Sequence, residues 1–341
     1  MTNTAIALPP CWFDRAVPAY RADGSAAFLT AEGDLIEGIY LNMPNDVYHQ
    51  LPAISSSQVK KFAESPAHWA RAYRSDVKRK RTLAQERTFD TGSLGHELIL
   101  EPEGFASRYA RMPCQVDYPN ALAGVKDMTA KAKELGLKGY SGKSKEELAK
   151  LLLEADPTLE IWDVILADAL TAAGDRQAID PIVWDDAHRI ERTCRAEPRA
   201  DQLIRDGAPE VAMIARCPTT GEWLKVKFDW LRFDGIAADV KTTRSANPQK
   251  FAYQMRDLRY DLQQVFYTYV ASLLDVEVTD FAFVAIEFLE ADICHVFELS
   301  SRKIARAAGE MHTLLAQMSR ALALNDFQGY VPRGTITVLD W

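Results

Sequence analysis

The chain has 341 residues, of which 48% are hydrophobic and 26% charged, and its formal net charge is −8. It is therefore a globular protein, long enough for one large domain with insertions or for two domains. The negative charge argues against a generally basic surface for nucleic acid, so any such contact needs positive charge that is concentrated locally.

The N-terminal part predicts a lead segment followed by the main domain. Residues 1–37 contain Pro9-Pro10 and Gly24 and are expected to be loosely structured or to carry a strand. The main domain is expected over residues 38–341. Its first helix is predicted over Ser55–Ala72, opened by a serine-rich cap.

A basic run comes next, Lys78-Arg79-Lys80-Arg81, with Arg71, Arg74 and Arg87 nearby. Such a run is either a solvated surface or a DNA contact, and a contact would be strongly sensitive to salt. Downstream, the small residues Gly92 and Gly95 precede His96 on a predicted helix. A histidine there is either a metal ligand or phosphate contact, or a histidine packed in the core.

Residues of about 120–175 are predicted to form a small helical insertion. Val125–Ala155 has the pattern helix, turn, helix, and Ser144 with Glu147 predicts a capping box for the second helix. The unit resembles helix-extension-helix (SAP-like) modules, which often bind DNA, and Lys143 belongs to its basic side. The alternative is a small packing hairpin. Helices are then expected over about Asp180–Arg205.

The most informative stretch is a predicted hairpin with strands over Trp223–Phe233 and Ile236–Thr242, joined at Asp234-Gly235. Asp239 and Lys241 are two residues apart, so they point to one face, which Asp229 on the neighbouring strand can reach. Two carboxylates there can share Mg²⁺ or Mn²⁺ beside a lysine, a site for metal-assisted phosphodiester hydrolysis. The alternative is an edge hairpin whose polar residues only face water.

The following segment predicts a long helix over Tyr253–Leu274. It carries Gln263 and Tyr267, which lie four apart on one face and can bind a phosphate or a nucleotide edge. The alternative is that Tyr267 is a core residue and Gln263 a residue of the helix surface. Two strands over Phe281–Glu298 and a helix over Ser301–Leu324 complete the chain.

The five cysteines are scattered and form no Cys-X-X-Cys pair. They predict neither a disulfide framework nor a zinc or iron–sulfur site. We also find no signal peptide and no run approaching the ~20 apolar residues of a membrane span. A cytosolic location is expected.

Four motifs together resemble the PD-(D/E)XK nuclease superfamily, specifically the exodeoxyribonuclease VIII (RecE-type) nuclease domain. These are Gly95-His96, the acid Asp229, Asp239-Val240-Lys241 and Gln263 with Tyr267, in that order. The opening Ile54-Ser55-Ser56-Ser57 and Ser65-Pro66-Ala67-His68 is also similar to that family. Phe228 stands where relatives usually carry proline, a backbone preference that leaves Asp229 as the expected ligand.

The resemblance implies an α/β fold, a mixed central sheet flanked by helices. It implies that His96, Asp229 and Asp239 bind the metal and that Lys241 is the catalytic lysine. Gln263 and Tyr267 would lie near the DNA backbone. Glu210 stands where relatives carry an acid near the metal.

The function expected from the resemblance is metal-dependent degradation of linear double-stranded DNA, 5′ to 3′, leaving 3′ overhangs for phage-type recombination in a bacterial cytoplasm. Expected partners are DNA ends, a single-strand annealing recombinase and further copies in a ring-shaped homo-oligomer. The alternatives are a sequence-specific endonuclease of the same superfamily and a non-catalytic DNA-binding recombination protein.

Overall fold

The computed structural model describes residues 11–75 and 83–339, and the side chains of 83–90 are not described. The chain forms two compact units, one of residues 1–86 with 189–341 and the other of residues 87–188. In sequence, the second unit is thus inserted into the first. The predicted DNA contacts at Arg79, Lys80 and Arg81 lie outside the described residues.

The first unit is built on a mixed seven-stranded sheet with strand order β1-β2-β5-β6-β7-β8-β9. The pairs β1–β2 and β7–β8 are parallel, and the other neighbours are antiparallel. A parallel pair needs a crossover connection, which the two helices between β7 and β8 provide. The strands are β1 Val17–Pro18, β2 Gly38–Leu41, β5 Gly207–Arg216, β6 Trp223–Arg232, β7 Ile236–Thr243, β8 Asp280–Glu287 and β9 Ile293–Glu298.

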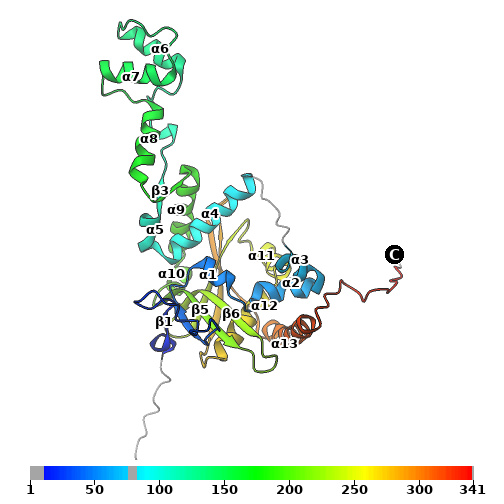
Figure 1. Ribbon diagram of the computed structural model, residues 1–341. Helices are drawn as coiled ribbons and strands as arrows, with labels where there is room; N and C mark the ends of the chain where they lie inside the picture. The colour runs from blue at the N-terminus through cyan, green and yellow to red at the C-terminus, as the bar shows by residue number, and fades with distance from the viewer. Residues whose placement is uncertain (1–10, 76–82, 340–341) are drawn as a thin grey trace, which may run out of the picture. The chain divides into compact units, whose positions relative to one another are not determined.

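Helices cover the main apolar face of this sheet, where α12 packs against β5 and β6 and against helices α2 and α13 (Figure 1). A second, smaller cluster around Tyr40 and Ile214 lies on the opposite face. The helical elements of this unit are η1 Trp12–Arg15, α1 Asn45–Gln50, α2 Ser56–Glu64, α3 Pro66–Tyr73, α10 Pro198–Leu203, α11 Pro248–Asp257, α12 Tyr260–Ser272 and α13 Ser301–Leu324.

The predicted hairpin is confirmed, with β6 and β7 joined through Gly235 at φ +86°. The two strands over Phe281–Glu298 and the helix over Ser301–Leu324 are also confirmed as β8, β9 and α13. In the lead segment, Trp12 is buried and its Nε1 donates a hydrogen bond of 2.7 Å to the Arg232 carbonyl. The described part of the lead is therefore tied to the hairpin.

Two long helices predicted from periodicity are wrong, because each is broken in the middle. Ser55–Ala72 divides into α2 and α3 at Ser65-Pro66, since a proline disfavours helical backbone in the preceding residue. Tyr253–Leu274 divides into α11 and α12 at Arg259, which has φ +53°. Its guanidinium is anchored by Asp261 and Glu310.

The second unit contains the predicted insertion. Helices α6 and α7 pack around Met128, Leu148 and Leu152, a core of their own, and the capping box of Ser144 and Glu147 is confirmed. Its elements, with the two helices that continue into the first unit, are α4 Leu83–Leu100, α5 Pro102–Arg108, β3 Tyr109–Arg111, η2 Gln115–Asp117, α6 Val125–Glu134, α7 Lys145–Ala155, α8 Trp162–Ala173, β4 Gln177–Ile179 and α9 Pro181–Ala196.

No helix in the described parts of the chain combines the length and the apolar character needed to cross a membrane.

The hairpin turn generates a stability prediction. Gly235 and Gly221 both have positive φ, at +86° and +74°, but an added Cβ at Gly235 would lie 2.6 Å from the Glu277 carbonyl oxygen, whereas Gly221 faces open space. We expect Gly221→Ala to lower the free energy of unfolding by about 1–2 kcal/mol, the cost of left-handed backbone for a residue with a Cβ. Gly235→Ala should cost clearly more, because the clash adds to it. Urea denaturation of both variants checks this, and equal losses would contradict it.

Candidate functional site

The site begins where the inward and outward alternation of β5 and β6 changes phase. In β5, Ala208 and Val211 are both in the main core although they are three residues apart. In β6, Phe228 and Leu231 show the same odd spacing. Regular strands bury residues at even spacing, so both strands are distorted at the same level.

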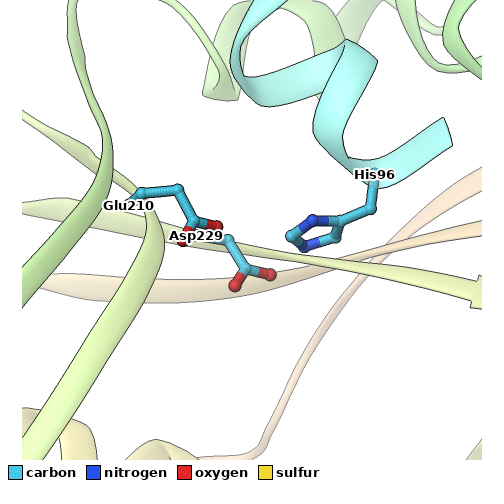
Figure 2. A group of neighbouring side chains, drawn as sticks. All are labelled: His96, Glu210 and Asp229. Atoms are coloured by element: carbon cyan, nitrogen blue, oxygen red, sulfur yellow. The ribbon is translucent and has the colours of Figure 1, made fainter. Parts of the chain in front are cut away.

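Glu210 and Asp229 occupy this distortion. They lie opposite each other between the paired residues Pro209–Trp230 and Val211–Phe228. Glu210 has φ +52°, a strained conformation for a residue with a long side chain, which is typical of functional sites. Figure 2 shows the two carboxylates together on neighbouring strands, and one oxygen of each lies within 4.8 Å of the other.

Asp229 also bridges the point where β6 and β7 separate. The two strands are paired only at Trp230–Ala238 and Leu231–Ala237. Beyond that, the Asp229 carboxylate accepts a hydrogen bond of 2.8 Å from the backbone N–H of Val240. A side-chain oxygen thus takes the place of a missing backbone partner. This hydrogen bond fixes the Asp229 carboxylate at Val240, the residue that follows Asp239 in β7.

A lysine accompanies Glu210. Lys227, on β6 and nearly buried, forms an ion pair with the Glu210 carboxylate and donates a hydrogen bond of 2.8 Å to Asn45 Oδ1. Lys227 is two residues from Asp229, the spacing that places side chains on one face of a strand. We did not predict this residue, although that alternation was a usable signal.

Asp239 is the most deeply buried acid of the site, with 2% of its surface exposed. Its Oδ2 lies 2.5 Å from Lys241 Nζ, and its Oδ1 accepts a hydrogen bond of 2.5 Å from Gln263 Nε2 of α12. The predicted common face of Asp239 and Lys241 is therefore confirmed. A buried carboxylate needs such partners, because removal from water otherwise destabilises its charged form.

The charge of Lys241 is maintained by its neighbours. Burial lowers the pKa of the Lys241 ammonium, but the negative charges of Asp239 and Asp229 outweigh burial and hold that pKa above its ordinary value. Lys241 also lies 5.2 Å from the centroid of the Tyr260 ring, an attractive position for a cation. It is therefore a hydrogen-bond donor and a fixed positive charge at neutral pH.

Tyr267 lies on the same helix as Gln263, but its ring packs against aromatic side chains. The ring centroids of Phe228 and Phe281 are 5.1 and 6.2 Å away. Burial raises the pKa of its phenol well above the ordinary value, and the nearby acids Asp229 and Asp239 contribute in the same direction. The hydroxyl is therefore protonated and able to donate a hydrogen bond.

Two further predicted residues lie in the second unit. His96 is half-buried on α4, one turn after Gly92, and Lys143 lies just before α7, 3.9 Å from Glu147. Within the first unit, the structure brings together Glu210, Asp229, Asp239, Lys241 and Gln263 as predicted. The roles assigned to all these residues stay predictions.

The oxygen donors fit a divalent metal ion. Two carboxylates from adjacent strands, with oxygens within 4.8 Å of each other, offer the hard ligands that Mg²⁺ and Mn²⁺ prefer. The positive charges of Lys227 and Lys241 already balance Glu210 and Asp239. A metal ion would therefore share these carboxylates with the lysines.

One family model and two solved structures are similar to this chain. A family model described as a PDDEXK-like domain of unknown function matches residues 55–327. A crystal structure of a candidate exonuclease from Eubacterium rectale superposes with a TM-score of 0.49, at 11% identity, covering 87% of this chain and 97% of that one. The crystal structure of SSO0001 gives a TM-score of 0.22, at 15% identity, over 57% of this chain and 76% of that one. No curated protein matches significantly.

The ion pair between Asp239 and Lys241 generates a prediction about metal binding. Lys241→Met leaves a buried carboxylate without its cation, and in EDTA we expect the free energy of unfolding to fall by about 3 kcal/mol. Mn²⁺ should then raise the melting temperature more in Lys241→Met than in the wild type, because the ion supplies the missing charge. Calorimetry with EDTA and with Mn²⁺ measures both effects.

The matched control is Lys250→Met, because Lys250 is an exposed lysine of α11. It should respond to Mn²⁺ as the wild type does. Equal stabilisation of Lys241→Met and wild type by Mn²⁺ would contradict the idea that lysine and metal neutralise the same carboxylates.

Proposed function

The chain belongs to the family of PDDEXK-like domains, and on that premise we propose that it is a metal-dependent deoxyribonuclease. The observation that carries the proposal is the geometry around β7. Asp239 and Lys241 are held 2.5 Å apart on one face, in the same unit as the paired carboxylates of Glu210 and Asp229. An acid cluster beside a lysine is suited to hydrolysis of a phosphodiester bond.

From the motif resemblance we propose that His96 of the second unit joins Asp229 and Glu210 in binding the ion, with Asp239 as a further ligand. The donors, carboxylate oxygens and one imidazole, are acceptable to Mg²⁺ and more so to Mn²⁺. A bound divalent ion supplies a Lewis acid for the phosphate and lowers the pKa of an attacking water.

The residues of the chain supply orientation and charge. Lys241, kept protonated by Asp239 and Asp229, donates a hydrogen bond to the attacking water or to a non-bridging phosphate oxygen, where negative charge develops. Gln263 fixes the Asp239 carboxylate through its N–H group. Tyr267 keeps its proton because it is buried, so its hydroxyl is a donor toward the DNA backbone.

The type of nuclease and the direction of degradation are proposed from the motif resemblance. On that ground we propose an exonuclease that degrades linear duplex DNA from 5′ ends and leaves 3′ overhangs for phage-type recombination. A ring-shaped homo-oligomer and a single-strand annealing partner belong to the same proposal.

DNA contacts outside the site are proposed for Lys143 and for the basic run at Arg79, Lys80 and Arg81. Lys143 is accompanied by Glu147 at 3.9 Å, a loose pair that leaves the ammonium able to contact a phosphate. Contacts of this kind raise affinity for any sequence and weaken as salt is added.

The proposal predicts how linear and covalently closed circular duplex DNA are digested. With Mg²⁺, the wild type should release a 5′ label from linear DNA early, release a 3′ label late and leave circles intact, whereas EDTA should abolish digestion. Lys241→Ala should lower the rate by at least a hundredfold, the order that loss of one electrostatic donor costs. Gel and filter assays of the labelled DNA measure this.

The control variant is Lys150→Ala, which removes a strongly exposed lysine of α7 whose ammonium lies 4.0 Å from Glu154. It should cut as the wild type does. Cutting of circles would replace the exonuclease with an endonuclease of the same superfamily. DNA binding without digestion in Mg²⁺ or Mn²⁺ would refute the catalytic proposal.

A further inference from the structure

A second lysine lies at the edge of the Asp239 cluster. Lys60, half-buried on α2, places its Nζ 3.4 Å from Gln263 Oε1 and 5.7 Å from the centroid of the Tyr260 ring. Lys241 lies 5.2 Å from the same ring centroid. Two lysines that are far apart in the sequence therefore approach one aromatic ring.

Gln263 makes two polar contacts, and together they allow only one orientation of its side-chain amide. Its Nε2 donates to Asp239 Oδ1 at 2.5 Å, and its Oε1 faces Lys60 Nζ at 3.4 Å. A carboxylate only accepts hydrogen bonds and an ammonium only donates them. A flipped amide would therefore point its oxygen at the carboxylate and its N–H groups at the ammonium, and both contacts would be repulsive.

We propose that Lys60 is a positioning residue of the site, which holds the Gln263 amide with its N–H toward Asp239. This inference rests on the proposed nuclease function. Lys60 acts through Gln263, whose amide lies between it and the acid. Without its ammonium, one of the two contacts that select the amide orientation is lost, and Asp239 is held less firmly.

The surroundings keep Lys60 charged at neutral pH. Burial lowers the pKa of its ammonium to about 8, and the charge of Lys241 adds to that effect, while Asp239 and Asp261 oppose it. The ring face of Tyr260, which is stacked on Phe283 at a centroid distance of 5.4 Å, is fixed against the sheet and attracts the cation. Lys60 thus has a defined place beside the amide.

The neighbouring residue provides a matched control. Lys61, next to Lys60 on α2, forms an ion pair of 2.6 Å with Glu64 and is exposed over 39% of its side chain. Lys61 lies on the same helix as Lys60 and carries the same ammonium group, but its side chain pairs with Glu64. Lys61→Met should leave every property of the site unchanged.

The experiment combines a double-mutant cycle with metal binding. The variants are Lys60→Met, Lys60→Gln, Lys60→Arg, Gln263→Leu and the double Lys60→Met/Gln263→Leu. For each, kcat and KM for linear duplex DNA are measured in saturating Mn²⁺, and Mn²⁺ affinity is measured by calorimetry without DNA. Thermal unfolding in EDTA verifies that each variant is folded, and Lys60→Gln replaces Lys60→Met if the latter is not.

Loss of a residue that orients a metal ligand typically costs about 10–100-fold in metal affinity or activity. We expect Lys60→Met and Lys60→Gln to lower kcat and Mn²⁺ affinity by about tenfold, with the KM for DNA within about twofold of the wild type. Lys60→Arg should restore most of both. In the Gln263→Leu background, Lys60→Met should add less than about twofold, because its route to Asp239 is already gone.

Three results would overturn the inference. A rise in KM with unchanged kcat would make Lys60 a DNA contact instead. Additive effects of Lys60→Met and Gln263→Leu would show that Lys60 does not act through the amide. Unchanged kcat and Mn²⁺ affinity in Lys60→Met would show that Lys60 has no role in the site. If the wild type digests no DNA, the nuclease proposal fails by itself, and Mn²⁺ affinity alone decides the role of Lys60.

Discussion

The burial of one carboxylate, that of Asp239, sets the conditions for the whole site. With 2% of its surface exposed, Asp239 must be neutralised and hydrogen-bonded inside the protein. Lys241 provides the charge from two residues away, and Gln263 provides the donor from α12. That helix must therefore start near Tyr260 and lie against the sheet, and α2 must lie close enough for Lys60 to reach the amide. One desolvated acid thus links β7, α12 and α2.

The sequence was sufficient for the features that depend on local spacing. The hairpin turn, the common face of Asp239 and Lys241 and the capping box at Ser144 all follow from neighbouring residues, and the structure confirms them. Periodicity failed where a single residue changes the backbone direction, as at Pro66 and Arg259. It also could not reveal Lys60 or the strained backbone of Glu210, because both depend on contacts between segments distant in the chain.

The site is balanced electrostatically by the protein itself. Lys227 pairs with Glu210 and Lys241 with Asp239, while Asp229 accepts a backbone N–H. These partners keep the acids in place, so a metal ion bound there would meet an organised set of ligands. The same partners would compete with the ion for lone pairs. The proposed metal affinity would therefore be a compromise between preorganisation and competition, and each lysine would contribute to both.

The interruption of the first unit by the second has a consequence for the time course of folding. Tyr40 of β2 pairs with Ala212 of β5, and between them in the chain stands the whole of residues 87–188. The loop that this pairing closes is long, but its entropic cost grows only with the logarithm of its length, so the native sheet is penalised little. Synthesis is sequential, however, and β2 leaves the ribosome well before its partner exists. The inserted unit can pack its own core around Met128 and Leu152 during that interval. Until β5 is made, the N-terminal strands expose unpaired backbone N–H and C=O groups at their edge.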